Sequence, residues 1–308
     1  MSNSVMILGE VLGDVFPEKT IIGGAPYNVS RHCHAFGLDV HLLTAVGKDA
    51  LGQRILDEMH DSGLSTKGVQ QHAALPTGQV KVHFEQHGHR FEILDNQAYD
   101  ALDWLPVETL TEQYSPELVY FGTLALRHAP MQGVAEEWLK LCESATVFCD
   151  INLRAPWYDK TTVELALKAA DILKINHEEL PEVCKLLGLA AEPDLNAQAR
   201  QLLKAFQLRE MFVTCGEQGS FWLDEHGSSF REAPVPLQAP FVDSVGAGDA
   251  YTSIVIRGLL ADMPRQTMLT DAARFAAAIC GIRGAVPEGA ELYQDFAAPA
   301  FGHKSAKN

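Results

Sequence analysis

Residues 243–249 form the run Asp243-Ser244-Val245-Gly246-Ala247-Gly248-Asp249, and an apolar stretch with helical spacing follows it directly. A glycine-rich turn that leads into a helix leaves backbone N–H groups unpaired and aimed at one point, with the positive end of the helix dipole behind them. The run therefore predicts an anion site. An aspartate here would repel a phosphate, but Asp249 is useful if it orients a hydroxyl group and accepts its proton during phosphoryl transfer. A plain helix start with an aspartate cap is the simpler alternative.

The composition is typical of a soluble globular protein with a sizeable core, since 47% of the 308 residues are hydrophobic and 21% are charged. This length suits one large α/β domain or two ordinary ones. No apolar run approaches the roughly 20 residues that span a bilayer, and the N-terminal residues lack the basic region of a secretory signal. We therefore expect a cytoplasmic protein.

The charge and the cysteines limit the partners further. A net charge of −16 argues against nucleic acid and anionic membranes. Any bound polyphosphate must then be held by local dipoles and a metal ion, because the overall field repels it. The six cysteines include no CxxC pair, which predicts free thiols rather than a zinc or disulfide framework.

Apolar runs of strand length alternate with segments of helical spacing along most of the chain. The expected strands are 5–10, 40–46, 117–122, 146–150, 171–175 and 210–215. The expected helices are 26–36, 49–61, 130–143, 161–170, 177–187 and 194–205. This alternation predicts an α/β fold with a mostly parallel sheet covered on both faces. Ligands of such sheets bind beyond the carboxyl ends of the strands.

Residues 66–98 break this rhythm. Within them, 79–85 and 90–94 alternate with period two around a turn at Gly88, which predicts a hairpin with one solvated face. We interpret this hairpin as a lid or a dimerisation flap.

Two further glycine-containing stretches precede expected helices. The helix 26–36 is opened by Gly23-Gly24-Ala25-Pro26-Tyr27-Asn28, in which paired glycines permit close approach and Asn28 can direct its amide into a site. The second stretch, Gly47-Lys48-Asp49-Ala50-Leu51-Gly52, follows a strand and begins another helix. Taken singly, each is only a reasonable helix start.

In this order and spacing, the pieces resemble the ribokinase-like (PfkB) carbohydrate kinase family, closest to its fructokinase branch. The stretch from Gly23 through Gly52 is similar to the family's N-terminal signature, and 243–249 is similar to its C-terminal signature with Ser244 in place of threonine. Residues 176–179, Asn-His-Glu-Glu, resemble its Asn-x-x-Glu motif, and 213–219, Val-Thr-Cys-Gly-Glu-Gln-Gly, resemble its nucleotide loop. Together these motifs span nearly the whole chain.

The resemblance implies an α/β fold of the ribokinase-like type, a three-layer sandwich with a mostly parallel central sheet and a small β lid. Residues 1–308 would form a single kinase domain, into which 66–98, with part of 13–24, would be inserted as the lid. A homodimer through the lid is also implied. The small-molecule partner would be a sugar, and the cofactors ATP and Mg²⁺, with K⁺ as a further candidate.

The resemblance also implies roles for individual residues. The implied catalytic residues, base and anion hole, are Asp249, Gly246, Ala247 and Gly248. The implied substrate-binding residues are Asp14, Gly24, Asn28 and Arg154. ATP would contact Asn176, Thr214, Gly216 and Gly219. Mg²⁺ would be held by Asn176 and Glu179, mainly through water, and a monovalent cation would lie near Asp243.

Two segments bear on the sugar. Two segments resemble those of fructokinases, namely Asp150-Ile151-Asn152-Leu153-Arg154 and Gly122-Thr123-Leu124-Ala125-Leu126. The ribokinase branch tends to carry a sugar-facing glutamate near the second segment. This chain has no glutamate between Gly122 and Arg127, which disfavours ribose. Fructose is thus the expected substrate, with 2-keto-3-deoxygluconate as the leading alternative because its kinases share the Asp-x-Asn-x-Arg segment. An acid sugar needs a nearby cation, for which the candidates are Arg31, Arg90, Arg127 and Arg154. Tyr27 replaces the usual small residue and would narrow the sugar pocket or pack outward.

Other functions are weighed against these. A nucleoside kinase of the same fold would need aromatic residues to stack a base, for which Tyr27, Phe16 and Phe84 are candidates. A non-catalytic sugar sensor would have lost the base or the anion hole, whereas both are intact. Residues 246–251 lack the third glycine of a dinucleotide fingerprint, and Asp49 after Gly47-Lys48 excludes an ordinary P-loop. The histidines at 32, 34, 83, 87 and 89 are interpreted as structural or solvated rather than as metal ligands.

Overall fold

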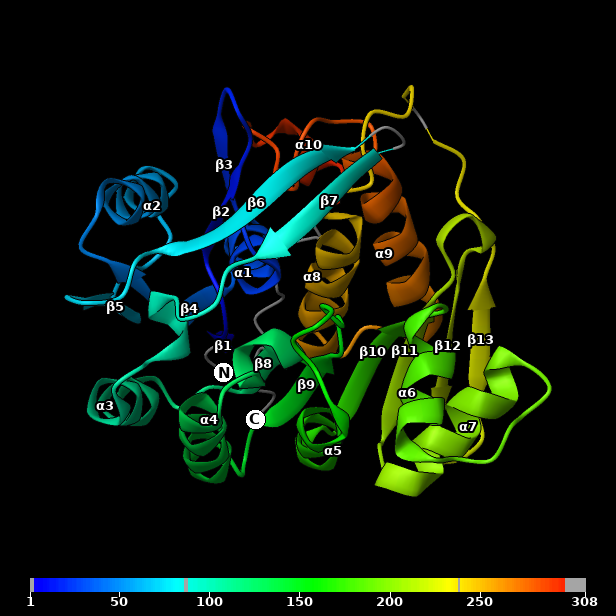
Figure 1. The fold of residues 1–308 in the computed structure, drawn as a ribbon. Helices are drawn as coiled ribbons and strands as arrows, with labels where there is room; N and C mark the ends of the chain where they lie inside the picture. Colours follow the sequence, from blue (N-terminus) through cyan, green and yellow to red (C-terminus); the bar gives the residue numbers. More distant parts are fainter. Residues whose placement is uncertain (1–2, 86–87, 238, 297–308) are drawn as a thin grey trace, which may run out of the picture.

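Nine strands form one large sheet in the order β13-β12-β11-β10-β9-β8-β1-β4-β5 in a computed structural model, which describes residues 3–85, 88–237 and 239–296 (Figure 1). Their bounds are β1 Ser4–Leu8, β4 Asp39–Gly47, β5 Val69–His72, β8 Leu118–Gly122, β9 Thr146–Asp150, β10 Ile172–Asn176, β11 Glu210–Thr214, β12 Ser220–Asp224 and β13 Ser229–Glu232. From β5 to β11 all neighbouring strands are parallel, whereas β11, β12 and β13 pair in antiparallel fashion at one edge. The predicted mostly parallel sheet is confirmed.

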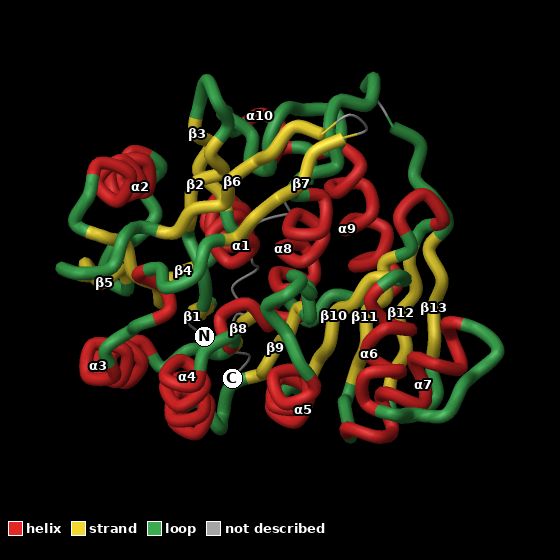
Figure 2. Tube along the Cα trace, viewed as in Figure 1, coloured by secondary structure: helices red, strands yellow, loops and turns green. Residues whose placement is uncertain are grey.

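Helices cover both faces of this sheet (Figure 2). One face carries α3 Trp104–Tyr114, α4 Ala129–Leu141, α5 Lys160–Ala169, α6 Glu179–Leu187 and α7 Leu195–Phe206. The other carries α1 Ala25–Ala35, α2 Ala50–Asp61, α8 Ala247–Leu260, α9 Arg265–Ile279 and the short α10 Glu291–Gln294. Successive strand residues point to opposite faces, so Met6 and Leu8 of β1 pack into the first core while Val5 and Ile7 pack into the second. The result is a three-layer sandwich.

A second, four-stranded sheet extends beyond one edge of the large sheet (Figure 1). It runs in the order β3-β2-β6-β7, and its bounds are β2 Leu12–Val15, β3 Thr20–Gly23, β6 Gly78–Glu85 and β7 Gly88–Ile93. The pair β6–β7 is the hairpin that the period-two pattern predicts, and β2 lies parallel to β6. We call these four strands the small sheet.

One part of the expected lid range belongs elsewhere. The sequence assigns 66–98 to the lid, but β5 pairs in parallel with β4, from Thr44 beside Val69 to Gly47 beside His72. The order β4–α2–β5 is a strand–helix–strand unit, which delivers its second strand parallel to the first. Because β5 contains only one apolar residue, Val69, no apolar run marks it in the sequence.

Asp49 joins the small sheet to the large one. Its carboxylate caps α2 by accepting from Gly52 N at 2.8 Å, and it also accepts from Thr77 N at 2.8 Å and Thr77 Oγ1 at 2.7 Å. Thr77 in turn accepts from Gly47 N at 2.9 Å, and Gly78 begins β6 directly after it. The stretch 47–52 therefore anchors the first residue of the hairpin.

The six strands and six helices expected from periodicity are all present, with ends within about two residues of the prediction. All six cysteines are free, as predicted. Over the described ranges, no helix combines the length and apolar character that a membrane crossing requires.

Candidate active site

Polar side chains gather where neighbouring strands of the large sheet end. Asp150 ends β9, Asn176 ends β10 and Thr214 ends β11, and these strands are parallel neighbours, so their carboxyl ends lie side by side. The N-terminus of α8 meets them there, because a Cβ built on Gly248 would lie 3.7 Å from Lys174 Nζ of β10. This is the edge at which ligands of parallel sheets bind.

The turn before α8 requires glycine at position 246. Gly246 has a φ of 79°, in the left-handed region, and a Cβ there would lie 2.4 Å from the Cα and Cβ of Ala285. The N–H of Ala247 donates to Ser244 O at 3.2 Å, whereas those of Gly248 and Asp249 have no acceptor within the described part of the chain. These two free donors and the helix dipole can bind an anion.

Asp249 and Asn28 meet across 221 positions of sequence. The Asn28 amide Nδ2 donates to Asp249 Oδ2 at 2.8 Å, while the Asn28 Oδ1 is buried and has no partner among the described residues. Burial raises the pKa of Asp249 to about 6, although the hydrogen bond from Asn28 stabilises the charged form and opposes this rise. A carboxylate with a pKa near 6 can accept a proton at neutral pH more readily than a free aspartate.

A buried ion pair supports the first turn of α8. Lys174 Nζ donates to Asp150 Oδ2 at 2.7 Å, and both side chains are almost fully buried. Thr252 Oγ1 lies 3.1 Å from the same carboxylate oxygen and 3.0 Å from Gly248 O. The pair thus links β9 and β10 to the glycine turn. Sequence reasoning missed Lys174, although a single lysine inside an otherwise apolar strand was a signal.

Glu10, Asp14 and Arg154 share one electrostatic environment. Burial raises the pKa of Asp14 to about 6 and that of Glu10 to about 7, and the Arg154 guanidinium lowers both. Arg154 also lowers the pKa of Asp249. The exposed Arg154 thus stabilises the charged form of all three carboxyl groups. Sequence reasoning did not select Glu10, which lies two residues after the end of β1 and is 4% exposed.

Gly24 lets the chain pass close to Glu10. Its φ is 109°, and a Cβ on it would lie 2.7 Å from Glu10 O. The next residue, Ala25, donates its N–H to Glu10 Oε1 at 3.2 Å. The start of α1, and with it Asn28, is therefore fixed against the end of β1.

Asn176 and Glu179 form a reciprocal cap at the start of α6. Asn176 Oδ1 accepts from the N–H groups of Glu178 and Glu179, both at 2.9 Å, and Glu179 Oε2 accepts from Asn176 N at 3.0 Å. Glu179 Oε1 accepts from Leu153 N at 2.8 Å, which holds the loop that carries Arg154. Burial raises the pKa of Glu179.

These contacts bear on the implied Mg²⁺. Asn176 Oδ1 already accepts two backbone N–H groups, whereas each carboxylate oxygen of Glu179 accepts one and retains a second lone pair. The pair therefore fits an ion held through its waters better than an ion bound directly, in keeping with the reluctance of Mg²⁺ to lose water.

The expected nucleotide loop follows β11. Thr214 lies beside Asn176 in the sheet, and Gly216 begins the 3₁₀ turn Gly216–Gln218. Gly219 has a φ of 85°, and a Cβ on it would lie 2.1 Å from Glu232 O. Thr214, Gly216 and Gly219 thus occupy a tight turn beside the Asn176 cap.

Asp243 lies before the glycine turn and is tied to the backbone. Its Oδ1 accepts from Val245 N at 3.1 Å, and its own N–H donates to Cys280 O at 3.3 Å. The sequence allows two roles for Asp243, to tie the loop or to hold a monovalent cation. These bonds correspond to the first role.

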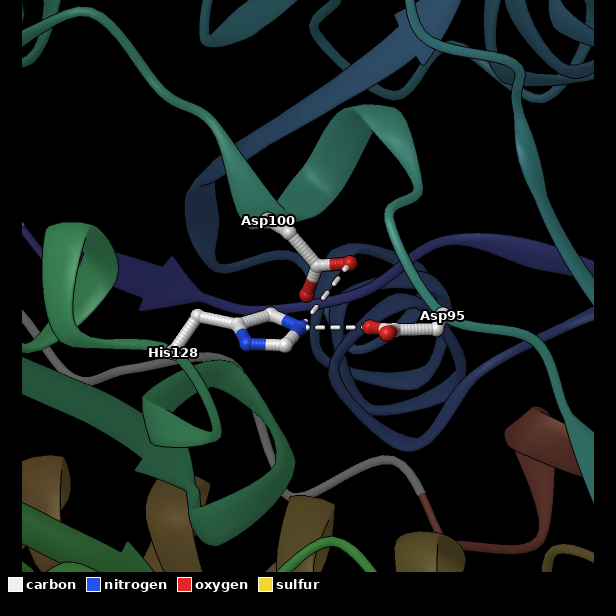
Figure 3. Close-up of side chains that lie close together, drawn as sticks. All are labelled: Asp95, Asp100 and His128. Atoms are coloured by element: carbon white, nitrogen blue, oxygen red, sulfur yellow. Dashed lines mark hydrogen bonds and ion pairs between the residues drawn. The ribbon is translucent and has the colours of Figure 1, made fainter.

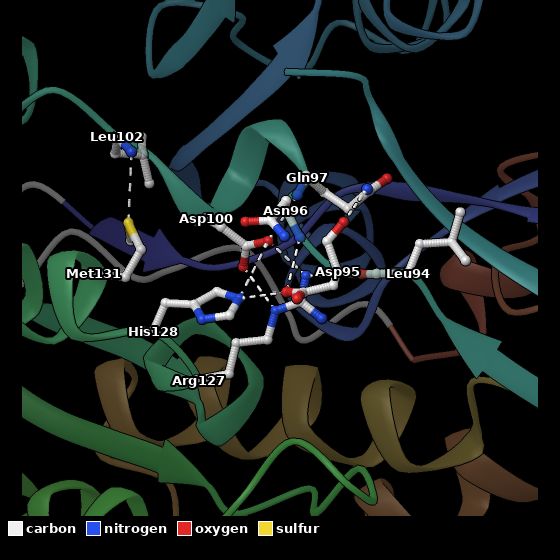
Figure 4. Close-up of polar contacts among 9 residues, drawn as sticks. All are labelled: Leu94, Asp95, Asn96, Gln97, Asp100, Leu102, Arg127, His128 and Met131. Carbon is white, nitrogen blue, oxygen red and sulfur yellow. Dashed lines mark hydrogen bonds and ion pairs between the residues drawn. The ribbon is translucent and has the colours of Figure 1, made fainter. Parts of the chain in front are cut away.

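A cluster that sequence reasoning missed lies where the chain leaves β7. Ligand atoms of Asp95, Asp100 and His128 lie within 4.8 Å of one another (Figure 3). Arg127, however, binds Asp100 in a two-pronged pair, with Nε to Oδ1 at 2.7 Å and Nη2 to Oδ2 at 2.5 Å (Figure 4). Because the guanidinium already neutralises Asp100, a cation there would meet repulsion, and the cluster is an ion-pair network rather than a metal site.

Family comparison agrees with this geometry. The model of the pfkB family carbohydrate kinases matches residues 8–289. The chain belongs to this family. It is accordingly a carbohydrate kinase, a phosphotransferase with an alcohol group as acceptor. A fructokinase of Klebsiella pneumoniae is 26% identical over 275 residues, which cover 85% of this chain and 86% of the relative.

Solved kinase structures share the fold. The fructokinase of Xylella fastidiosa with bound ATP superposes with a TM-score of 0.79 at 19% identity, over 97% of this chain and 100% of that one. The 2-dehydro-3-deoxygluconokinase of Thermotoga maritima superposes with a TM-score of 0.75 at 18% identity, over 96% and 99% of the two chains. The ribokinase-like fold is thus confirmed.

The four arginines that are candidates to bind an acid sugar in this carbohydrate kinase differ in their partners and their exposure. Arg31 donates to Tyr27 Oη and to Glu58, and Arg127 is held by Asp100. The side chain of Arg90 lies outside the described residues, as does that of Phe84. Of the three candidates whose side chains are described, only Arg154 combines exposure with a position near the candidate site, and its guanidinium bonds to its own neighbour, Leu153 O.

Tyr27 does not narrow the site. Its ring is buried in the core, and its hydroxyl donates to Glu58 Oε1 of α2 at 2.9 Å. The sequence leaves two outcomes open, and the structure shows the second: Tyr27 packs away from the sugar pocket. Tyr27 is therefore removed as a candidate to stack a nucleobase.

Proposed function

We propose that this carbohydrate kinase transfers the γ-phosphoryl group of ATP to a hydroxyl group of fructose. The observation that carries the proposal is the hydrogen bond of 2.8 Å between Asn28 and Asp249 at the N-terminus of α8. It joins a base of raised pKa to a helix start with free N–H donors. Fructose is favoured by the fructokinase relative from Klebsiella pneumoniae and by the Gly-Thr-Leu-Ala-Leu segment at 122–126.

In the proposed mechanism, Asp249 orients the sugar hydroxyl and receives its proton late, because the transition state of phosphoryl transfer is loose. The free N–H groups of Gly248 and Asp249, in the turn built by Gly246 and Ala247, stabilise the charge on the transferring group. Asp14, Gly24, Asn28 and Arg154 border the sugar. The unpartnered Oδ1 of Asn28 can accept from a sugar hydroxyl.

ATP would lie along the tight turn of Thr214, Gly216 and Gly219, beside Asn176. Asn176 and Glu179 would hold Mg²⁺ through its waters, and the ion would neutralise charge on the phosphates. We also propose a K⁺ site at Asp243, whose Oδ1 already accepts from Val245 N.

A 2-keto-3-deoxygluconate kinase is the second candidate, and Arg154 favours it. Among the described residues, this exposed guanidinium bonds only to Leu153 O, and it lies near Asp14 and Asp249, where the carboxylate of an acid sugar could bind. The nucleoside-kinase alternative loses support because Tyr27 points away. The sensor alternative does so because the base and the turn are both present.

The test is ADP release from Mg-ATP with fructose, 2-keto-3-deoxygluconate, ribose, tagatose and adenosine. We expect strong turnover on fructose alone. Arg154→Gln separates the two candidates, because loss of the cation should raise KM at least tenfold for an acid sugar and less for fructose. Turnover on the acid sugar alone would transfer the assignment to the second candidate.

Location and assembly are also proposals. Six free cysteines are typical of a reducing compartment, which favours the cytoplasm. The small sheet has an open edge at β7, where Phe91 is 54% exposed, and we propose a homodimer through this sheet.

A further inference from the structure

A cavity of about 500 Å³ lies at the C-terminal end of α1, and its lining includes none of the proposed catalytic, sugar-binding or ATP-binding residues. It is bounded by α1, by Arg257 of α8 and by the segment 286–294. Cavities of this size hold small metabolites. No role in the proposed reaction uses it.

The lining has both charge and apolar surface. Arg31, His34 and Arg257 supply cationic or potentially cationic groups, and Glu288 is the one carboxylate among the described lining residues. The apolar walls come from Phe36, Val286, Pro287 and Tyr293. The chain has a net charge of −16, so this cavity with two arginines is a local concentration of positive charge in a negatively charged protein.

Arg257 is the most informative of these groups. It is only 4% exposed, its Nη1 donates to Phe296 O, and its guanidinium lies 5.0 Å from the ring centre of Phe36. Burial lowers its pKa, and Asp271 compensates this only in part. An anion in the cavity would supply the missing counter-charge.

A chain of contacts leads from the cavity to the glycine turn. Tyr293 lines the cavity, and its Oη lies 2.9 Å from His32 Nδ1. His32 Nε2 lies 3.0 Å from Ala285 O. A carbonyl oxygen can only accept, so Nε2 carries the proton and Nδ1 accepts from the tyrosine. Burial lowers the pKa of His32 to about 3, which keeps the ring neutral in this arrangement.

Ala285 completes the connection. Its Cα and Cβ pack so tightly on Gly246 that a Cβ on the glycine would approach them to 2.4 Å. Tyr293, His32 and Ala285 therefore form a continuous chain of contacts to the turn that precedes Asp249. This gives the neighbouring histidines 32 and 34 separate places, one in the relay and one in the cavity wall.

We propose that this cavity binds a small organic anion, a phosphate monoester in chemical class, and that the contacts Tyr293–His32–Ala285 pass its occupancy to the glycine turn. The guanidinium of Arg257 and the nitrogens of Arg31 other than Nη1, which binds Tyr27 and Glu58, suit a phosphate, and the apolar wall suits its organic part. Occupancy holds the Tyr293 side of the relay in place, which pre-organises the turn for phosphoryl transfer. The binding claim is independent of the proposed function, whereas the effect on turnover rests on it.

Binding is tested at Ala35, an exposed residue of the cavity wall at the last position of α1. The probe is glycerol 3-phosphate, measured by isothermal titration calorimetry on the wild type, Ala35→Glu and Ala35→Gln. The glutamate brings a negative charge into the cavity and should weaken binding at least tenfold. The matched glutamine should keep binding within about threefold. Any glycerol 3-phosphate that binds at the glycine turn does so equally in all three proteins, so it does not contribute to the difference between them.

Equal affinity of the two Ala35 variants would overturn the site. Inorganic phosphate serves as a second probe, and it should bind at least tenfold more weakly than the monoester because it leaves the apolar wall unused. Equal binding of both probes would contradict the monoester class.

The coupling is tested with Tyr293→Phe, which keeps the ring and removes the hydroxyl donor to His32. Glycerol 3-phosphate should raise wild-type kcat by about fivefold, the low end of usual coupling, with little change in KM for the sugar. In Tyr293→Phe the probe should bind within about threefold of the wild type but leave kcat unchanged. A rate effect that persists in the variant would overturn the relay.

Failure of the proposed function gives a different result. In that case the protein releases no ADP with any sugar, while the calorimetric difference between the Ala35 variants remains.

Discussion

Asp249 is held by two opposing influences, burial that favours the protonated form and the Asn28 amide that favours the charged one. If Asp249 is the base, kcat/KM should fall about tenfold per pH unit below a pH near 6, because the acid form cannot accept a proton. Asn28→Ala removes the donor and should move this acidic limb to higher pH. The measurement is a pH–rate profile of both proteins. An unchanged limb in the variant would separate Asn28 from the titration.

Glu10 provides a stability prediction at the same scale. Burial raises its pKa from 4.5 to about 7, so the folded state holds this proton more tightly than the unfolded state. The stabilisation is complete below pH 4.5 and is lost as pH rises through 7, at a cost of about 3 kcal/mol. Glu10→Gln should therefore be more stable than the wild type at pH 8 and similar to it at pH 4.5.

Urea unfolding at the two pH values measures this difference. The control is Glu112→Gln, which changes an exposed glutamate on α3 and should alter stability little at either pH. A wild type as stable as Glu10→Gln at pH 8 would refute the burial argument.

Sequence patterns found the residues that carry a local signature and missed those defined by pairing. The glycine turn and Asn28 sit at helix starts with recognisable chemistry. Lys174 and Asp150 form their ion pair across neighbouring strands β9 and β10, so their contact depends on sheet register. Glu10 was missed for a similar reason, because its close contact with Gly24 joins residues from two different parts of the chain.

Among the elements, the exit from the small sheet depends on one buried ion pair. Arg127 binds Asp100 and also donates from Nη2 to Leu94 O at 2.9 Å, directly after β7 (Figure 4). Both side chains of the pair are almost fully buried. Asp100→Asn would leave the Arg127 charge without its main partner and should lower the free energy of unfolding by about 3 kcal/mol.

Guanidinium chloride unfolding of Asp100→Asn measures this loss. The control is Asp103→Asn, an exposed aspartate nearby whose side chain forms no cap hydrogen bond, and which should change stability by under about 0.5 kcal/mol. Equal stability of the two variants would show that the ion pair does not hold the small sheet.

The elements that sequence predicted well are those with long apolar runs, such as β4 and β8, where burial on both faces leaves a continuous signal. β13 was missed because it is an edge strand with mostly exposed side chains. α9 was missed because alanines fill much of its buried surface and blunt its periodicity. α3 and β12 were also not anticipated.

At the scale of the whole molecule, the small sheet presents an open edge. Phe91 of β7 is 54% exposed, and a homodimer through this sheet would bury it. We expect the wild type to sediment as a dimer and Phe91→Glu to shift it towards monomer. Leu105→Glu, at a residue 68% exposed on α3, is the control and should leave the dimer intact. Analytical ultracentrifugation decides between these outcomes, and a monomeric wild type would refute the dimer.

The central claim is that Asp249 at the glycine turn is the base for transfer of phosphate from ATP to a sugar. The most direct test is fructose-dependent ADP release from Mg-ATP by the wild type, Asp249→Asn and the control Asp103→Asn. We predict that Asp249→Asn lowers kcat by about 10²- to 10⁴-fold with KM values within a few-fold, because only proton acceptance and orientation are lost. The control should match the wild type. Near-full turnover by Asp249→Asn would contradict the account.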